Sequence, residues 1–107
     1  DFYTAYSDGK YALCFTCHSK AAFTEMVTTR ATGFRDGEKN LHFVHVNKSI
    51  KGRSCRSCHE VHADTGLAHH VQDAVGFSYW SMPMNYTPNK NGGSCMPGCH
   101  GEKRYSR

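Results

Sequence analysis

Hydrophobic residues in this chain form short groups that glycines and charged residues interrupt, so few stretches keep the period of a helix or a strand. A short helix is predicted over residues 20–28, with Ser19 as its N-terminal cap. Residues 41–46 alternate apolar side chains with histidines, which fits either an extended piece or a single helical turn. Residues 76–86 are rich in aromatic side chains but too broken to predict regular structure.

The polar segments between these stretches are predicted to be turns, loops and ends. Residues 33–40 are expected to form a polar turn and residues 89–93 a loop, because Gly and Asn recur in both. The charged residues 102–107 are expected to be mobile or to dock elsewhere. No run of about 18 apolar residues occurs, so no membrane-spanning helix is predicted.

Chain length and composition limit the core that this protein can build. The 107 residues suffice for a single domain, residues 1–107, and only 38% of them are hydrophobic. A chain of this size and polarity buries too little apolar surface to be stable on its own side chains. Six cysteines and eight histidines are far above ordinary usage. Together these counts suggest that a non-protein group completes the interior.

All six cysteines lie in three pairs, and a histidine follows each pair directly. The motifs are Cys-Phe-Thr-Cys-His at 14–18, Cys-Arg-Ser-Cys-His at 55–59 and Cys-Met-Pro-Gly-Cys-His at 95–100. Two thiols one helical turn apart can add to the two vinyl groups of a haem, and the next imidazole then reaches the iron. Pro97 and Gly98 allow the longer third motif a looser turn with the same result. The motifs predict three covalently attached c-type haems, held by Cys14, Cys17, Cys55, Cys58, Cys95 and Cys99.

Three other uses of cysteine explain the motifs less well. A disulfide framework favours an even cysteine count but gives no reason for a histidine after every second cysteine. Zinc ribbons and fingers place their second ligand pair about 15–20 residues after the first, whereas these pairs are about forty residues apart. A redox-active pair of the thioredoxin type would occur once, in a chain where strands and helices alternate.

The histidines divide into two groups. His18, His59 and His100 complete the motifs and are the predicted proximal ligands of iron. Each iron needs one further ligand, and the three-residue spacing within 42–45 points two imidazoles in different directions, toward two different irons. The five distal candidates, in order of preference, are His45, His42, His70, His62 and His69.

Methionine could compete for the same axial positions. The candidates are Met26, Met82, Met84 and Met96. With five spare histidines for three irons, we expect two histidines at each iron and correspondingly low reduction potentials.

The charge of the chain does not by itself identify a partner. The formal net charge of +4 would suit an acidic partner. Each haem carries two propionates, and its ferric centre leaves about one positive charge, so the three cofactors are expected to bring the net charge to about +1, which removes the main support for nucleic-acid binding. The aromatic residues in 1–13 are expected to form an arm that packs on the first haem or on another molecule.

The order of these motifs resembles that of the doubled Cys-x-x-Cys-His multihaem cytochrome c family. The resemblance rests on Leu-His-x-x-His at 41–45, Cys-x-x-Cys-His-x-x-His at 55–62 and Gly-Gly-Ser-Cys-x-x-x-Cys-His at 92–100. The chain is similar to the C-terminal portions of periplasmic and extracellular cytochromes of metal-reducing bacteria. By position, the family pattern matches His42, His45, His62 and His70 as distal ligands and leaves His69 outside it.

This resemblance implies a fold that is mostly coil, with a few short helices wrapped around three haems and little or no β-sheet. It also implies electron transfer through closely spaced haems, each with two histidine ligands. Some family members polymerise into filaments in which a histidine of one subunit ligates a haem of the next. The surplus distal candidate therefore favours a subunit of an extracellular conductive filament, with other redox proteins as electron donor and acceptor.

Two other functions are less favoured. A monomeric periplasmic electron carrier is the alternative with the same chemistry. A multihaem reductase would need an iron with an open position, and all three motifs end in histidine. Since the sequence starts at Asp1 with no leader, we expect a secreted protein in its mature form, after removal of a signal peptide.

Overall fold

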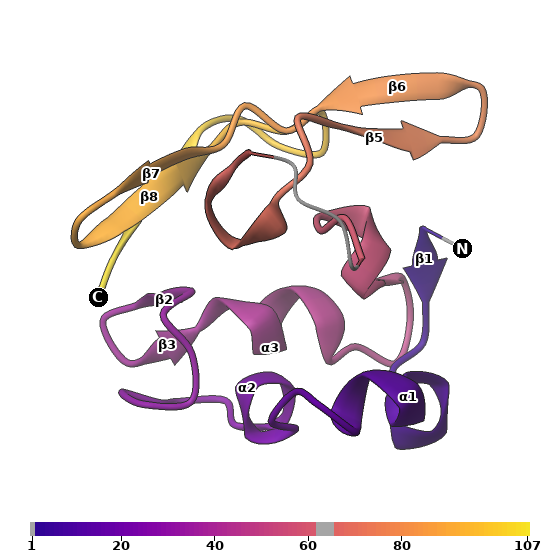
Figure 1. Ribbon diagram of the computed structural model, residues 1–107, viewed down its shortest axis with the longest axis vertical. Helices are drawn as coiled ribbons and strands as arrows, with labels where there is room; N and C mark the ends of the chain where they lie inside the picture. Colours follow the sequence, from indigo (N-terminus) through magenta and orange to yellow (C-terminus); the bar gives the residue numbers. More distant parts are fainter. Residues whose placement is uncertain (1, 62–65) are drawn as a thin grey trace.

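The computed structural model describes residues 2–61 and 66–107. Most of its helices lie in the first half of the chain and most of its strands in the second, and Figure 1 shows these two parts facing each other. The helices are η1 (Asp8–Tyr11), α1 (Ala12–Phe15), α2 (Ala21–Thr24), α3 (Leu41–Val46), η2 (Cys55–Ser57) and η3 (Ala68–His70). The strands are β1 (Tyr3–Thr4), β2 (Arg35–Asp36), β3 (Lys39–Asn40), β4 (Gly52–Arg53), β5 (Ala74–Phe77), β6 (Trp80–Pro83), β7 (Thr87–Asn89), β8 (Gly92–Cys95) and β9 (Lys103–Ser106).

The prediction of little or no β-sheet is wrong. Three two-stranded sheets pair β1 with β4, β2 with β3 and β5 with β6, and a three-stranded sheet has the order β7-β8-β9, all antiparallel. About 29% of the described residues are in strands and 24% in helices. A hairpin needs only a tight turn and backbone hydrogen bonds, so polar and exposed residues form these strands without an alternating hydrophobic pattern.

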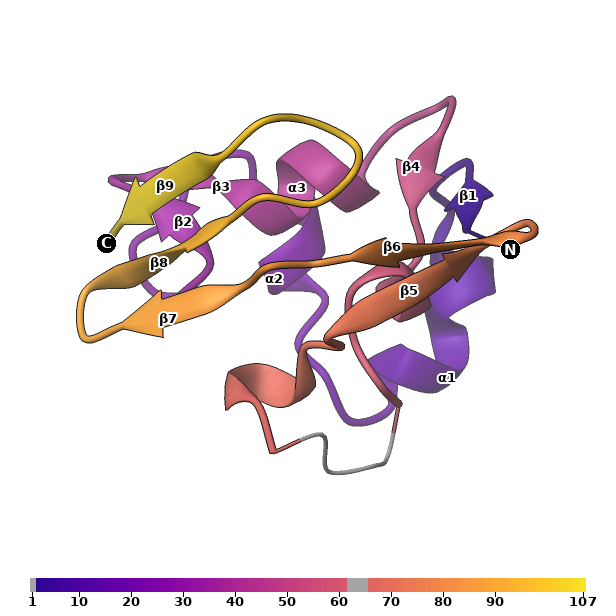
Figure 2. The same cartoon turned by 90° about the horizontal axis from the view of Figure 1, so that it is seen from above.

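Residues 76–86, predicted to lack regular structure, contain most of the β5–β6 hairpin. Phe77 pairs with Trp80 across a two-residue turn, and Val75 pairs with Met82. Ser78 in this turn has a φ of 56°, the left-handed conformation for which Gly or Asn is the usual sequence signature. Because this position is a serine, the sequence lacks the usual signature of a hairpin turn. In Figure 2 the β5–β6 and β7–β8 hairpins follow one another across the molecule.

The charged C-terminal tail docks as a strand beside the third motif. β9 pairs with β8, which places Lys103 opposite Cys95 and Ser106 opposite Gly92. Gly92 allows the two backbones to approach, because a Cβ there would collide with the carbonyl of Tyr105. Of the two outcomes expected for residues 102–107, docking rather than mobility is therefore the one observed.

The helix predicted over 20–28 is shorter than expected. α2 spans Ala21–Thr24 and ends where Glu25 becomes extended, with φ −81° and ψ 120°. Ser19 does not cap it: Lys20 occupies the cap position and makes no capping bond with its side chain. Val27, which was predicted to be helical, instead pairs with Lys39 in an antiparallel β-bridge.

Residues 41–46 take the helical alternative and form α3, with Asn40 as the cap. The Asn40 side chain is fully buried. Its oxygen accepts a hydrogen bond from the N–H of Phe43 at 3.2 Å. Its amide donates to the carbonyls of Ala22 and Glu25, at 3.0 and 2.7 Å. One side chain thus starts α3 and ties it to α2.

The protein core is small for this chain length. The buried hydrophobic side chains among the described residues are Tyr11, Val46, Val71, Val75 and Met84. The accessible surface is 7161 Å², against about 6,000 Å² for a typical folded protein of this mass. The radius of gyration of 13.3 Å is nevertheless close to the usual value of about 13 Å. The chain is therefore as compact as an ordinary domain, although few of its hydrophobic side chains are buried. Among the described residues, no helix combines the length and hydrophobicity needed to cross a membrane.

Candidate functional site

Two histidine rings on α3 face two histidines of the cysteine motifs. The ring centroids of His42 and His59 are 6.3 Å apart, with an interplanar angle of 34°. Those of His45 and His100 are 6.5 Å apart, with an angle of 44°. Because the two α3 residues are three positions apart on a helix of a single turn and a half, each ring reaches a different motif.

The separation within each pair fits two imidazoles bound on opposite sides of one iron. A metal–imidazole bond of about 2.0–2.1 Å, with the bonding nitrogen about 1.1 Å from the ring centre, puts the two centroids about 6.3 Å apart. Haem takes its axial ligands in such pairs, one from each side. Among residues 2–61 and 66–107, no group of three or more His, Cys, Asp or Glu side chains is arranged to hold a metal ion.

In each of these four rings Nδ1 already has a hydrogen-bond partner, which leaves Nε2 as the free nitrogen. In three rings the partner is a backbone carbonyl, so Nδ1 must carry the hydrogen and Nε2 keeps its lone pair. Histidine ligands in metal sites have this arrangement. In His42 the partner is the hydroxyl of Thr32, at 2.9 Å. The carbonyl contacts are His45 to Leu41 at 2.7 Å, His59 to His69 at 2.8 Å and His100 to Gly101 at 2.6 Å.

Burial keeps three of the imidazoles in the neutral form. Burial, with a smaller effect of the neighbouring His59 and His45, lowers the pKa of His42 to about 4. Burial also lowers the pKa of His45 and of His59, against the opposing effect of their carbonyl hydrogen bonds. A metal binds the neutral imidazole, and at neutral pH these three rings are uncharged.

Aromatic side chains enclose the two α3 histidines. Phe23 and Phe34 each lie 5.1 Å from the ring of His42, measured between centroids. Phe34 also stacks on His45 at 5.7 Å and meets Tyr105 edge-on at 5.1 Å. Phe34 therefore contacts both candidate distal ligands and, through Tyr105, the C-terminal strand β9.

The first two motifs each form one helical turn, in which the histidine N–H donates to the carbonyl of the first cysteine. The third motif is one residue longer, and the N–H of His100 donates to Pro97 instead, at 3.3 Å. The glycine that follows, Gly98, lies against Met82. The two helical contacts are His18 to Cys14 at 2.9 Å and His59 to Cys55 at 3.0 Å.

The thiols of the second motif are not activated. Burial raises the pKa of Cys55 and of Cys58 to about 11 each. The thiolate is the reactive form in disulfide exchange, so this environment does not suit redox chemistry of the thioredoxin type. Cys14 lies within hydrogen-bonding distance of Cys55, so the first and second motifs meet at these residues.

The other histidines are placed less clearly as ligands. His18 is exposed, and within the described part of the chain no histidine ring lies against it. His69 and His70 are exposed and have φ of 59° and 52°, and it is the backbone carbonyl of His69 that contacts His59. The candidate His62 lies outside the described residues. The structure thus brings the rings of His42 and His45 against motif histidines. His70 lies near enough to His59 to lower its pKa, but among the described residues its ring is not paired with that of a motif histidine.

Residues that the sequence analysis did not single out support the site. Gln72 donates from its side-chain amide to the carbonyl of His59 at 2.8 Å and from its N–H to Cys58 at 2.9 Å. Asn40 precedes a candidate helix and could have been recognised as a cap. Nothing marks Thr32 or Gln72, because their partners are 10 and 13 residues away in sequence.

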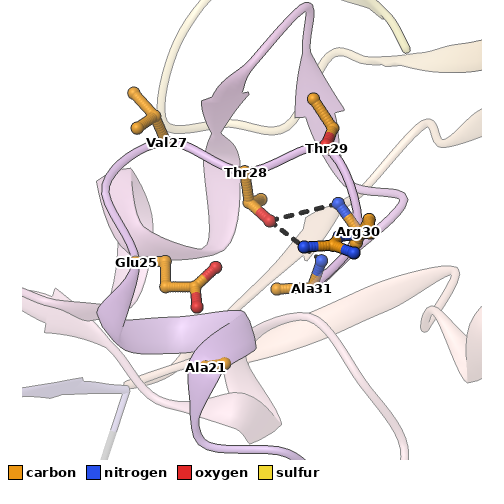
Figure 3. A pocket seen from close by; sticks show the side chains of 7 residues that line it. All are labelled: Ala21, Glu25, Val27, Thr28, Thr29, Arg30 and Ala31. Atoms are coloured by element: carbon orange, nitrogen blue, oxygen red, sulfur yellow. Dashed lines mark hydrogen bonds between the residues drawn. The ribbon is translucent and has the colours of Figure 1, made fainter.

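A surface hollow of about 420 Å³ lies beside α2 and contains none of the cysteines or histidines. Figure 3 shows the hydroxyl oxygen of Thr28, which accepts hydrogen bonds from the N–H groups of Arg30 and Ala31 at 3.2 and 2.9 Å. The hollow is thus formed by the loop that leads to Thr32. Its lining residues are Ala21, Glu25, Val27, Thr28, Thr29, Arg30 and Ala31.

No protein-family model matches this chain, and no curated protein or solved structure matches it. The function of this chain is therefore inferred from its cysteine motifs and from the geometry of its histidine pairs.

Proposed function

We propose that this chain is a trihaem c-type cytochrome that transfers electrons, with two histidines at each iron. The observation that carries the proposal is the pairing of His42 with His59 and of His45 with His100. In each pair one ring belongs to a cysteine motif and the other to α3. Packing of the core alone gives no reason why each of the two ring pairs should contain a motif histidine. Ligation of a haem iron does, because the motif histidine is one of its two ligands.

The residues of the chain would hold each cofactor both covalently and axially. Cysteines of the second and third motifs would form the thioethers, and His59 and His100 would be the proximal ligands. His42 and His45 would bind through Nε2 from α3, with the ring of Phe34 in contact with both imidazoles. A bound haem supplies an iron that gains or loses one electron.

Histidine on both sides of an iron favours electron transfer over catalysis. A reductase needs an iron position at which its substrate can bind, and the paired rings of α3 and the motifs would fill both ligand positions at two of the irons. Carbon monoxide is therefore expected not to bind these two sites in the folded, reduced protein. Binding to all three haems without denaturation would favour the reductase instead.

We propose that the first motif holds the third haem and that the chain assembles into an extracellular filament. Cys17 and His18 are exposed, so a neighbouring subunit could cover this site and supply its distal ligand. A periplasmic monomeric carrier that passes electrons between redox proteins is the alternative. The distal candidates left for this haem are His62, His69 and His70.

A pyridine haemochrome assay of the purified protein tests the central proposal. Three haems per chain, with iron and no zinc, are expected. A different haem count, or zinc in place of iron, would overturn the proposal. Negative-stain imaging of the same material separates a filament from a monomeric carrier, because only the filament gives long polymers.

A further inference from the structure

We infer that Thr32 is a positioning residue that fixes the tautomer and orientation of His42 and thereby sets the reduction potential of one haem. The inference rests on the proposed function. Its basis is the 2.9 Å hydrogen bond between Thr32 Oγ1 and His42 Nδ1. Among the four paired rings, this is the one whose Nδ1 partner is a side chain. A side-chain partner can be removed by mutation, whereas a backbone carbonyl cannot. A substitution at Thr32 therefore alters the environment of His42 and leaves the Nδ1 contacts of the other three rings in place.

The hydroxyl of Thr32 is itself held in place. Its oxygen accepts a hydrogen bond from the N–H of Phe34 at 3.0 Å, a local contact common for threonine in turns. The ring of Phe34 then lies 5.1 Å from His42, and Phe23 contacts the same imidazole at 5.1 Å. Rotation of the imidazole would break the hydrogen bond and disturb both ring contacts. His42 therefore has one preferred orientation, in which Nδ1 is held by Thr32 and Nε2 is left without a partner from this contact.

A second threonine braces the loop that carries Thr32. Thr28 is buried, and its oxygen accepts from the N–H groups of Arg30 and Ala31 (Figure 3). Its own N–H donates to the carbonyl of Glu38 at 2.8 Å, which ties the loop to the turn between β2 and β3. These contacts involve backbone groups and no imidazole. Thr28 thus stabilises the same loop without contacting a ligand.

A hydroxyl differs from a carbonyl because it can either donate or accept. If Thr32 donates to Nδ1 of His42, Nε2 carries the hydrogen and cannot bind a metal. If Nδ1 donates to Thr32, Nε2 is free, and the hydroxyl oxygen accepts two hydrogen bonds, one from His42 and one from Phe34. Only the second arrangement is compatible with ligation.

Accepting this hydrogen bond makes His42 a stronger electron donor to its iron. Removal of the acceptor is therefore expected to favour the reduced iron and to raise one of the three reduction potentials. It should also weaken the bond to His42, since loss of such an outer partner typically costs about 10–100-fold in metal affinity. An external ligand would then displace His42 more easily at this one site.

The test uses Thr32→Val, Thr32→Ser and Thr28→Val in the haem-loaded full chain. Thr32→Val keeps the shape and removes the hydroxyl, Thr32→Ser keeps the hydroxyl, and Thr28→Val weakens the loop without touching His42. In a potentiometric titration followed by visible absorption, Thr32→Val should raise one potential and leave two unchanged, while Thr32→Ser and Thr28→Val keep all three. In a cyanide titration of the ferric protein, Thr32→Val should bind cyanide about 10–100-fold more tightly at one haem.

Two results would overturn the inference while three haems per chain still support the proposed function. One is a Thr32→Val protein with unchanged potentials and unchanged cyanide affinity. The other is an equal shift in Thr28→Val, which would assign the effect to the folding of the loop. A wild-type protein without haem would instead overturn the proposed function itself.

Discussion

The side-chain oxygen of Asn40 accepts a hydrogen bond from the N–H of Phe43, at the start of the helix that presents both His42 and His45. The amide of the same side chain donates to the carbonyl of Ala22 within α2 and to that of Glu25 just after it. The buried Asn40 side chain therefore fixes the position of α3, and with it the positions of His42 and His45.

Asn40→Ala is expected to lower the free energy of unfolding by about 2–4 kcal/mol, because it removes a helix cap and the two hydrogen bonds that the buried amide donates to the carbonyls of Ala22 and Glu25. Denaturant titration followed by far-UV circular dichroism measures the loss. Asn47→Ala is the matched control, since the Asn47 side chain donates one hydrogen bond, to the carbonyl of Phe23 at 3.0 Å, and its loss should cost about 1 kcal/mol. Equal losses in the two variants would contradict this ranking.

His42→Met and His45→Met are expected to act on two different irons. Each should replace one pair of histidine ligands by histidine and methionine, add a methionine–iron absorption band and raise one potential. The double variant should show the sum of the two changes, because the pairs are separate. Visible spectra and potentiometry of the three proteins provide the measurement. A double variant that looks like either single variant would mean that both residues serve one iron.

Gly92→Ala is expected to separate β9 from β8, because a methyl group there collides with the backbone of Tyr105. The cost in unfolding free energy should be about 1–3 kcal/mol, as for other overpacked sites. Hydrogen exchange of the β9 amides should become faster at the same time. Gly101→Ala is the control, because its added Cβ meets no atom within 4 Å. Unchanged exchange in Gly92→Ala would show that the strands can shift to make room.

Tyr6 is expected to make the protein less stable at high pH. Burial, together with the hydrogen bond to Asp8, raises the pKa of Tyr6 to about 12. A free tyrosine has a pKa of about 10, so the folded state favours the neutral phenol. This contribution is complete below pH 10 and is lost as the pH rises toward 12. Urea unfolding between pH 9 and pH 12 should show a smaller decline for Tyr6→Phe than for the wild type, and parallel declines would exclude this role.

The residues of the candidate site could be named from the sequence because each motif is local. Each cysteine pair and its histidine lie within six residues or fewer, so their spacing alone specifies the predicted haem attachment. The cap at Asn40 has the same local character. The contact between Thr32 and His42, in contrast, joins residues 10 positions apart, and no short pattern reports it.

The fold was harder to predict than the motifs. Strands such as β6 and β9 expose most of their side chains and are stabilised by backbone pairing, which leaves no hydrophobic alternation in the sequence. The turn at Ser78 uses a residue without a strong preference for positive φ. Sheet content therefore exceeded the prediction.

The sequence by itself determined the set of candidate ligands, because residue type and spacing decide which side chains could attach and ligate haem. Only the tertiary structure decided that His42 faces His59 and His45 faces His100. That pairing depends on the rotation of α3, which buried contacts with Asn40 and Phe34 fix. Such contacts form when distant segments pack together, and their free energy is a property of the folded chain rather than of any short stretch of it.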